Sequence, residues 1–258
     1  MAIYKTEITS DSIPSDNPIH QRLLKPYVVI AEWVKGDLLE LGCGEGRGFD
    51  LLAPRVENYL GMDKIPRVIE SLKKKYGTDL FRQSVFPPLA SLRDHSFDYV
   101  VSFQVIEHIR DDSLFLQEIY RILKPGGKAY LTTPNKRLSL TRNPWHIREY
   151  EAFELFELTN RYFNKVDLKG IHGNHKVVEY YARNKRSVEK IMKYDVFDLQ
   201  HKLPSFLLRI PYEFLNRLNR NRLKTADDEG VLSISHEDYQ VSDIPEESLD
   251  LFAILHKE

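Results

Sequence analysis

The sequence predicts a doubly wound α/β domain, in which a mostly parallel sheet carries helices on both faces. Two observations favour it: short apolar runs alternate with segments of helical spacing, and the run at 96–103 is apolar enough to be buried on both faces. Such alternation is typical of parallel strands joined by helical crossovers. Seven strands are expected, at 38–41, 58–63, 78–82, 96–103, 128–133, 163–170 and 249–256.

Helices are expected where apolar residues recur three and four positions apart. In the first helix, 19–34, Asp16 stands where an N-cap is expected, and Pro26 is expected to kink or divide the helix. Asp111 is placed to cap a later helix that Pro125-Gly126-Gly127 is expected to stop. The remaining helices of the core are predicted at 47–53, 66–76, 112–124 and 151–161.

The composition is that of an ordinary globular chain. Of its 258 residues, 42 % are hydrophobic and 29 % charged, and the net charge of −1 provides no overall attraction to nucleic acid or to an anionic membrane. A single cysteine, Cys43, excludes an intramolecular disulfide framework and a cysteine-based zinc cluster. No run of about 18 apolar residues is present, and residues 1–16 lack the apolar core of a secretory signal. We therefore expect a cytoplasmic protein without a transmembrane segment.

Residues 175–248 break the alternation and are expected to form an insertion before the last strand. Helical spacing is interrupted at Pro204 and Pro211, and 201–224 hold six basic residues against one acid. Residues 225–250 contain nine acids and neither Lys nor Arg. Basic helical faces bind phosphates or membrane surfaces, but they are more often solvated. We expect a substrate lid or homodimer element, with membrane-surface contact as the weaker alternative. The domains are thus a core with its N-terminal helix at 1–174, a helical and acidic insertion at 175–248 and a closing strand at 249–258.

A candidate ligand site lies where the apolar run at 38–41 breaks into glycines at 42, 44, 46 and 48. Glycine permits positive φ and close approach of the backbone to a ligand. A strand, a glycine turn and a helix start in succession form a ligand site at the carboxyl end of a parallel strand. The dinucleotide fingerprint fails, because Arg47 occupies the sixth position from Gly42, and no Gly-Lys-Ser/Thr of a P-loop follows.

Three segments resemble motifs of one enzyme superfamily. Residues 38–46 resemble motif I, which is written (V/L)-L-(D/E)-(L/I)-G-C-G-x-G. Residues 96–109 resemble the signature S-F-D-x-V-x-x-x-x-V-L-E-H-(I/V). Residues 121–128 resemble the R-V-L-K-P-G-G segment that leads into the fifth strand. By this resemblance the chain is identified as a class I S-adenosylmethionine-dependent methyltransferase of the type 11 group. The resemblance implies a Rossmann-like methyltransferase fold, in which the last strand, 249–257, is antiparallel and lies next to 163–170.

The resemblance also implies which residues bind S-adenosylmethionine. An acid at the end of the second strand, Asp63, accepts hydrogen bonds from vicinal ribose hydroxyls; the alternative is an acid that caps a loop. Arg22 is expected to pair with the cofactor carboxylate, or else to be a solvated helix charge. The other expected cofactor residues are Glu40, Gly42, Cys43 and Gly44 for the methionine part, Ser84 and Val85 for the adenine, and Phe103 and Gln104 beside the sulfonium.

The acceptor is expected after the fifth strand. Residues 133–136 and 143–150 are similar to the T-P-N…N-P-(F/W)-H-x-R-E-(Y/L) stretch of methyltransferases associated with glycan and cell-envelope biosynthesis. His146 is the candidate general base; the alternative is that His146 and Glu149 only tie the loop to the next helix. Adjacent Glu107 and His108 are assigned no catalytic role, since a helix-start contact and a packed histidine explain them equally well. The nine histidines show no H-x-x-x-H or comparable cluster, so no metal is expected.

Together these features predict methyl transfer to oxygen on a small molecule or a glycan or cell-envelope intermediate. The alternatives are C- or O-methylation of a quinone or polyketide-like molecule, and a non-catalytic scaffold that binds the cofactor. The (D/N)-P-P-(Y/F) motif of base-modifying enzymes is absent after the fourth strand, where 103–106 read Phe-Gln-Val-Ile, which argues against a DNA substrate.

Overall fold

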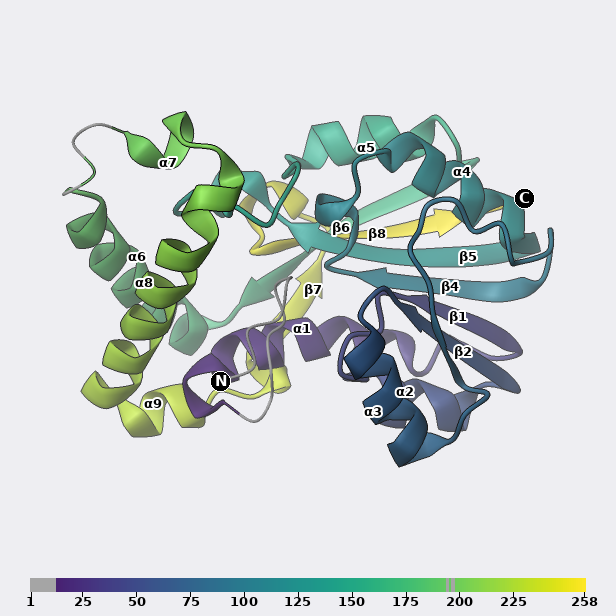
Figure 1. The fold of residues 1–258 in the computed structure, drawn as a ribbon, viewed down its shortest axis with the longest axis horizontal. Helices are drawn as coiled ribbons and strands as arrows, with labels where there is room; N and C mark the ends of the chain where they lie inside the picture. Colours follow the sequence, from purple (N-terminus) through teal and green to yellow (C-terminus); the bar gives the residue numbers. More distant parts are fainter. Residues whose placement is uncertain (1–12, 194, 196–197) are drawn as a thin grey trace.

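The computed structural model describes residues 13–193, 195 and 198–258. Within them, eight strands form one sheet in the order β3-β2-β1-β4-β5-β8-β6-β7 (Figure 1). The strands are β1 Asp37–Leu41, β2 Asn58–Asp63, β3 Phe81–Gln83, β4 Phe97–Phe103, β5 Leu123–Pro134, β6 Lys165–Gly173, β7 Tyr239–Ser242 and β8 Asp250–His256. The predicted doubly wound, mostly parallel sheet is confirmed.

The closing strand of the core, β8, lies antiparallel between β5 and β6, as expected. The sheet nevertheless has one strand more than the seven predicted, because β7 pairs antiparallel with β6 at the edge. β7 falls inside the acidic stretch that showed no pattern, and its four residues are too few for an alternation of period two to stand out.

Helices cover both faces of the sheet (Figure 1). In that view α4 and α5 lie above the sheet, and α1, α2 and α3 lie below it. The helices of the described residues are α1 Asn17–Ile30, α2 Phe49–Leu52, α3 Pro66–Tyr76, α4 Asp112–Ile122, α5 Ala152–Asn160, α6 His175–Met192, α7 Leu199–Lys202, α8 Ser205–Ala226 and α9 Asp228–Leu232.

Some local expectations were wrong. Pro26 lies inside an unbroken α1, and Pro211 lies inside α8, whereas Pro204 immediately precedes α8 as a break. The helix predicted at 47–53 starts only at Phe49, because the positive-φ glycines before it hold the chain in a turn. The helix that the Pro-Gly-Gly segment was expected to stop does end before it, at Ile122, but the segment itself belongs to β5, which begins at Leu123.

Two apolar clusters fill the space between the sheet and its helical layers. Leu38 of β1 packs into the cluster that contains α1, α2 and α3, whereas Leu39 packs into the cluster that contains α4 and α5. Successive strand side chains point to opposite faces, so each central strand contributes to both clusters. Val100 and Val101 of β4 are both fully buried, as the apolar run at 96–103 predicted.

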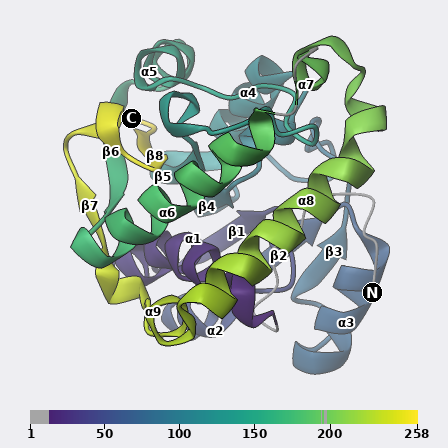
Figure 2. The same cartoon turned by 90° about the vertical axis from the view of Figure 1, so that its left-hand side faces the viewer.

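The insertion lies beyond the carboxyl ends of the parallel strands, where α6 and α8 stand to the left of the sheet in Figure 1 and in front of it in Figure 2. Buried Asp16 ties α8 to the start of α1. Its carboxylate accepts two hydrogen bonds from Arg217, at 2.8 and 3.1 Å, and a third from Arg220 at 3.1 Å. Asp16 precedes α1 but its side chain makes no capping hydrogen bond, because both of its oxygens bind these guanidinium groups.

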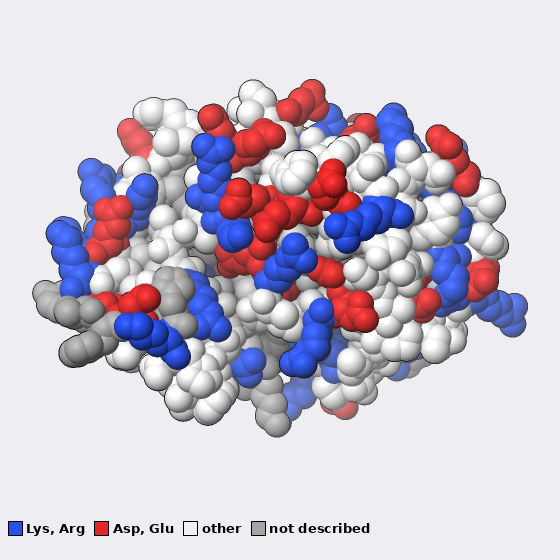
Figure 3. Space-filling view, turned by 90° about the horizontal axis from the view of Figure 1, so that it is seen from above, with Lys and Arg blue, Asp and Glu red and all other residues white. Residues whose placement is uncertain are grey.

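The surface over α4 and α5 carries both signs of charge (Figure 3). Acidic side chains gather near the centre of this face, with basic side chains around them. None of the described helices is both long enough and apolar enough to cross a membrane.

Replacing Asp16 with alanine tests whether the Asp16–Arg217–Arg220 cluster anchors α8. Asp16→Ala leaves two guanidinium groups without their buried acceptor, so we expect the free energy of unfolding to fall by about 3 kcal/mol in urea titrations. Asp243→Ala is the matched control, since Asp243 pairs with Lys169 at an exposed position, where ion pairs contribute little. Equal losses in the two variants would contradict the anchoring role.

Candidate active site

A cavity of about 1020 Å³ opens at the carboxyl ends of the parallel strands. The segments after β1, β2, β4 and β5 line one side of it, and α6 and α8 of the insertion line the other. Of the residues predicted for the site, Arg22, Gly42, Cys43, Gly44, Asp63, Val85, Phe103, Gln104 and His146 line this cavity. Glu40 and Ser84 are not among its lining residues.

The turn after β1 depends on glycine at two positions. Gly42 has φ of +79°, and a Cβ on it would lie 2.3 Å from the Val105 side chain. Gly44 has φ of +51°, but a Cβ there would meet nothing within 4 Å. Gly42 is therefore required by packing, whereas Gly44 exposes bare backbone to the open cavity, as a site for close ligand approach requires.

Asp63 stands at the end of β2 and is held by the glycine turn. Its carboxylate accepts hydrogen bonds from the amides of Gly44, at 3.0 Å, and Ile65, at 2.9 Å. The side chain is largely buried yet lines the cavity. The loop-capping role that the sequence left open is therefore real, and it fixes the carboxylate at the cavity wall.

Glu40 lies behind the turn and not in the cavity. Its carboxylate accepts a 2.6 Å hydrogen bond from Tyr27 and another from Tyr59, and the residue is completely buried. Burial raises the pKa of Glu40 from 4.5 to about 7. In this structure the acid of motif I therefore supports the turn through α1 and β2.

The remaining predicted residues divide between the cavity and its surroundings. Phe103 ends β4 and Gln104 follows it with a positive φ of +58°, and both residues line the cavity. Val85 is highly exposed on the cavity wall, whereas Ser84 lies beside it without lining the cavity. Burial raises the pKa of the Cys43 thiol, which therefore stays neutral at physiological pH.

Arg22 projects from α1 into the cavity lining, where Asp250 of β8 pairs with it. The two side chains lie 3.0 Å apart, and Arg22 also donates a 3.0 Å hydrogen bond to the hydroxyl of Tyr181 on α6. It is not the solvated helix charge that the sequence left as an alternative. Pairing with a cofactor carboxylate stays a prediction.

A second polar group, around His146, lines the same cavity. His146 lies between two side chains of its own loop: Nδ1 is 2.7 Å from Glu149 Oε1, and Nε2 is 2.9 Å from the Asn143 amide nitrogen. A carboxylate only accepts, so Nδ1 carries the proton and Nε2 is the basic nitrogen. This is the tautomer that a general base at Nε2 requires.

Glu107 joins this loop to β4 and β5. Its backbone carbonyl accepts from the amides of Ile147 and Arg148, at 2.8 and 3.3 Å, and its carboxylate accepts from Thr133 at 3.0 Å. Burial raises the pKa of Glu107 to about 7. His108 donates from Nδ1 to the Trp145 carbonyl at 3.0 Å.

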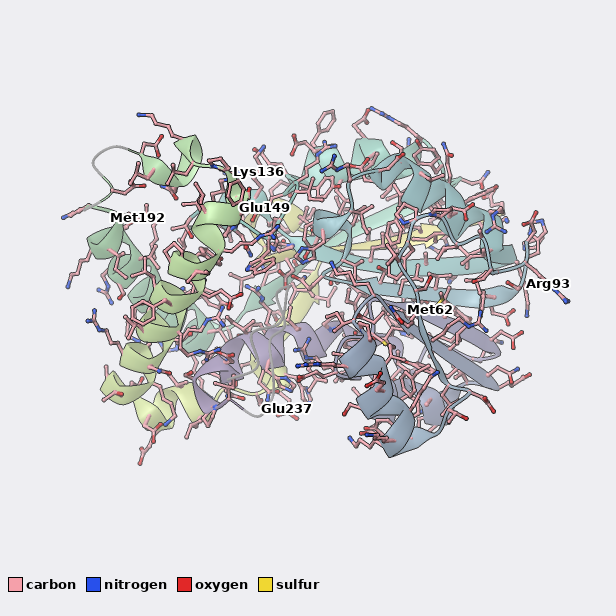
Figure 4. The ribbon with its side chains drawn as sticks, in the orientation of Figure 1. Met62, Arg93, Lys136, Glu149, Met192 and Glu237 are labelled. Atoms are coloured by element: carbon pink, nitrogen blue, oxygen red, sulfur yellow. The ribbon has the colours of Figure 1, made fainter. Side chains whose placement is uncertain are left out.

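The loop that carries His146 packs against α8. Trp145 does not line the cavity but packs under the guanidinium of Arg209 on α8, 4.3 Å from its ring centre. Figure 4 shows Glu149 and Lys136, both in the segment after β5, beside α8. Asn143 and Glu149 orient His146, although the sequence analysis named Asn143 only within a motif and Glu149 only as a tie between the loop and the next helix. Both stand three residues from His146 in the sequence, and this spacing is the feature that could have indicated their contact with it.

Sequence comparison agrees with this geometry. The family described as "Methyltransferase domain" matches residues 39–131, which span the glycine turn, Asp63 and Glu107. Residues 39–131 therefore resemble the methyltransferase domain of S-adenosylmethionine-dependent enzymes. This similarity indicates S-adenosylmethionine as the cofactor and methyl transfer as the chemistry.

Curated relatives share this region. A probable S-adenosylmethionine-dependent methyltransferase of Mycolicibacterium smegmatis is 37 % identical over 158 residues, 59 % of this chain and 61 % of the relative. One of Mycobacterium tuberculosis is 38 % identical over 127 residues, 47 % of this chain and 46 % of the relative. A ubiquinone biosynthesis O-methyltransferase of Pseudomonas entomophila is 30 % identical over 139 residues, 52 % of this chain and 55 % of the relative. The matches thus span about half to three fifths of these relatives' length.

Solved structures share the fold over most of the chain. An S-adenosylmethionine-dependent methyltransferase from Thermotoga maritima has a TM-score of 0.56 at 16 % identity, covering 93 % of this chain and 91 % of that one. One from Archaeoglobus fulgidus has a TM-score of 0.54 at 16 % identity, with 93 % and 94 % covered. The expected Rossmann-like methyltransferase fold is confirmed.

A methyl group added at Gly44 tests whether the bare backbone there contacts the cofactor. We expect Gly44→Ala to lose about 1–2 kcal/mol of stability from left-handed backbone strain, and to weaken binding of S-adenosylhomocysteine at least tenfold in calorimetric titration. Gly126→Ala is the control, because Gly126 also has positive φ, +80°, and open space around its Cβ position but does not line the cavity. Unchanged affinity in Gly44→Ala would contradict the contact.

The buried position of Glu40 predicts a pH-dependent stability. Its folded pKa, about 7, exceeds the ordinary 4.5, so its favourable contribution is present below pH 4.5 and is lost as pH rises through 7. We expect the unfolding free energy of Glu40→Gln, relative to the unmodified chain, to increase by on the order of 1–3 kcal/mol between pH 5 and pH 8. Loss of the tyrosine hydrogen bonds alone would change the unfolding free energy by the same amount at every pH. A difference that does not change with pH would therefore contradict the raised pKa.

Proposed function

We propose that this chain transfers the methyl group of S-adenosylmethionine to a hydroxyl oxygen of a small-molecule or glycan acceptor. The observation that carries the proposal is the placement of two chemically different ends in one cavity. One end has the bare backbone of Gly44 beside the Asp63 carboxylate, and the other has His146 with its basic Nε2.

The residues at the first end fit the cofactor. Asp63 is fixed by two backbone amides with its carboxylate at the cavity wall, where it would accept hydrogen bonds from ribose hydroxyls. The open space over Gly44 would admit the methionine part, and Val85 would pack against the adenine. When bound, the cofactor supplies an electrophilic methyl group, which an acceptor oxygen takes as the carbon–sulfur bond breaks and its electron pair returns to sulfur.

The residues at the second end would prepare the acceptor. Glu149 holds the Nδ1 proton of His146, which keeps Nε2 available to remove the proton of an acceptor hydroxyl. Nε2 already accepts a hydrogen bond from the Asn143 amide, 2.9 Å away. The acceptor hydroxyl would donate to Nε2 from the position that this amide now occupies. Phe103 and Gln104 lie on the same wall and would hold the reacting atoms in line.

The lining of the cavity supports a hydroxylated acceptor. The segment after β5 contributes Ser139 and Thr141, and the insertion contributes Asn184, Lys185 and Asn216. These hydrogen-bonding groups would bind the hydroxyl groups of a polyol or sugar. A quinone-like molecule is the second candidate for the acceptor, because one of the relatives is a ubiquinone biosynthesis O-methyltransferase.

The insertion at 175–248 would serve as the lid of this cavity, since α6 and α8 form its second wall. The apolar side chains of Phe206, Ile210 and Phe214 on α8 are exposed. Homodimerisation and membrane-surface contact through this helix stay predictions, as does a cytoplasmic location.

Calorimetric titration with S-adenosylhomocysteine, followed by a methyl-transfer assay on hydroxylated acceptors, tests the proposal. We expect Asp63→Ala to abolish or badly weaken cofactor binding. Asp63→Asn should weaken it less, because it retains one acceptor oxygen. Asp79→Ala is the control and should leave the cofactor affinity unchanged, since Asp79 is exposed. We expect His146→Ala to keep the cofactor affinity and to slow methyl transfer about 10²–10⁴-fold. A folded protein that binds neither S-adenosylmethionine nor S-adenosylhomocysteine would contradict the proposed enzymatic function and favour a non-catalytic scaffold.

A further inference from the structure

We propose that Glu107, His108 and His146 form a binding site for one divalent transition-metal ion at the acceptor end of the cavity. Their candidate ligand atoms all lie within 4.8 Å of one another, and all three residues line the cavity. Two imidazoles and one carboxylate are a recurrent ligand set for Zn²⁺, Fe²⁺ and similar ions, with coordination positions left open for a substrate.

The histidines are oriented as metal-binding histidines are. Nδ1 of His108 donates to the Trp145 carbonyl, at 3.0 Å, and Nδ1 of His146 donates to Glu149, at 2.7 Å. Such hydrogen bonds to a carbonyl or carboxylate fix the tautomer and make Nε2 the ligating nitrogen. The two rings lie edge to face with centroids 5.0 Å apart.

The backbone holds the three ligands together although they come from different segments. His108 and Glu107 belong to the single turn Ile106–His108 after β4, and His146 belongs to the loop after β5. The Glu107 carbonyl binds the amides of Ile147 and Arg148, which docks that loop next to the turn. Glu107 is buried, and a cation at this point would compensate the charge of its ionised carboxylate.

Metal binding requires two local adjustments. Ligand atoms around one Zn²⁺ at bonds of about 2.1 Å lie roughly 3.4 Å apart, so the side chains must draw together by about an ångström. The Asn143 amide, which lies 2.9 Å from His146 Nε2, must turn away. Both movements involve side chains of one short turn and one loop.

The consequence for the reaction rests on the proposed function. A metal here would leave a coordination position facing the acceptor and would lower the pKa of a bound hydroxyl. His146 would then act as a ligand in the metal-bound protein and as a base only without the metal.

Titration of the chelator-treated full chain with Co²⁺, followed by its visible absorption bands and by equilibrium dialysis, tests the site without using activity. We expect one Co²⁺ to bind per chain and to be displaced by Zn²⁺. The affinity for Co²⁺ should fall more than about 100-fold in Glu107→Gln and in His146→Gln, which lose a ligand. It should fall about 10–100-fold in Glu149→Gln, because Glu149 only orients His146. His175→Ala is the matched control, because His175 and Glu179 form an exposed pair 3.1 Å apart on α6 that could bind metal adventitiously.

Two results would overturn the metal site: no specific Co²⁺ binding to the folded chain, or binding that His175→Ala removes and Glu107→Gln retains. Each variant is also titrated with S-adenosylhomocysteine as a check on folding. Loss of metal binding with intact cofactor binding is therefore distinguishable from failure of the proposed methyltransferase.

Discussion

Parallel pairing of β2, β1, β4 and β5 is the constraint on which the site depends. The register sets Leu41 opposite Met62 and Phe103 opposite Thr132, so these strands end at one edge of the sheet. Gly42, Asp63 and Gln104 each follow or complete one of these strands and thereby reach one cavity. A shift of one residue in any pair would turn the side chains of that strand to the opposite face.

Buried polar groups then hold the edge in shape. Glu40 fixes the turn from behind through Tyr27 and Tyr59, and Glu107 links the ends of β4 and β5 to the acceptor loop. Burial raises the pKa values of both acids to about 7, close to physiological pH. Asp16 performs a comparable task for α8, with its charge compensated by two arginines.

The sequence predicted the core well because its signals are local. An apolar run that ends in glycine and a strand that ends in Asp63 can be recognised from adjacent residues alone. The position of Glu40 behind the turn could not be predicted in this way, because motif position does not reveal which face of a strand a side chain occupies. The group of Glu107, His108 and His146 also escaped prediction, since 37 residues separate its two parts and a search for regular ligand spacing excludes it. β7 was missed because a four-residue edge strand is specified by its partner and not by its own pattern.

A crystal structure of the chain with S-adenosylhomocysteine tests the central claim most directly. The account predicts that the ribose hydroxyls bind the Asp63 carboxylate, that the amino-acid part lies over Gly44, and that the sulfur faces the part of the cavity that holds Gln104 and His146. Cofactor bound elsewhere, or bound with its sulfur turned away from His146, would contradict the account.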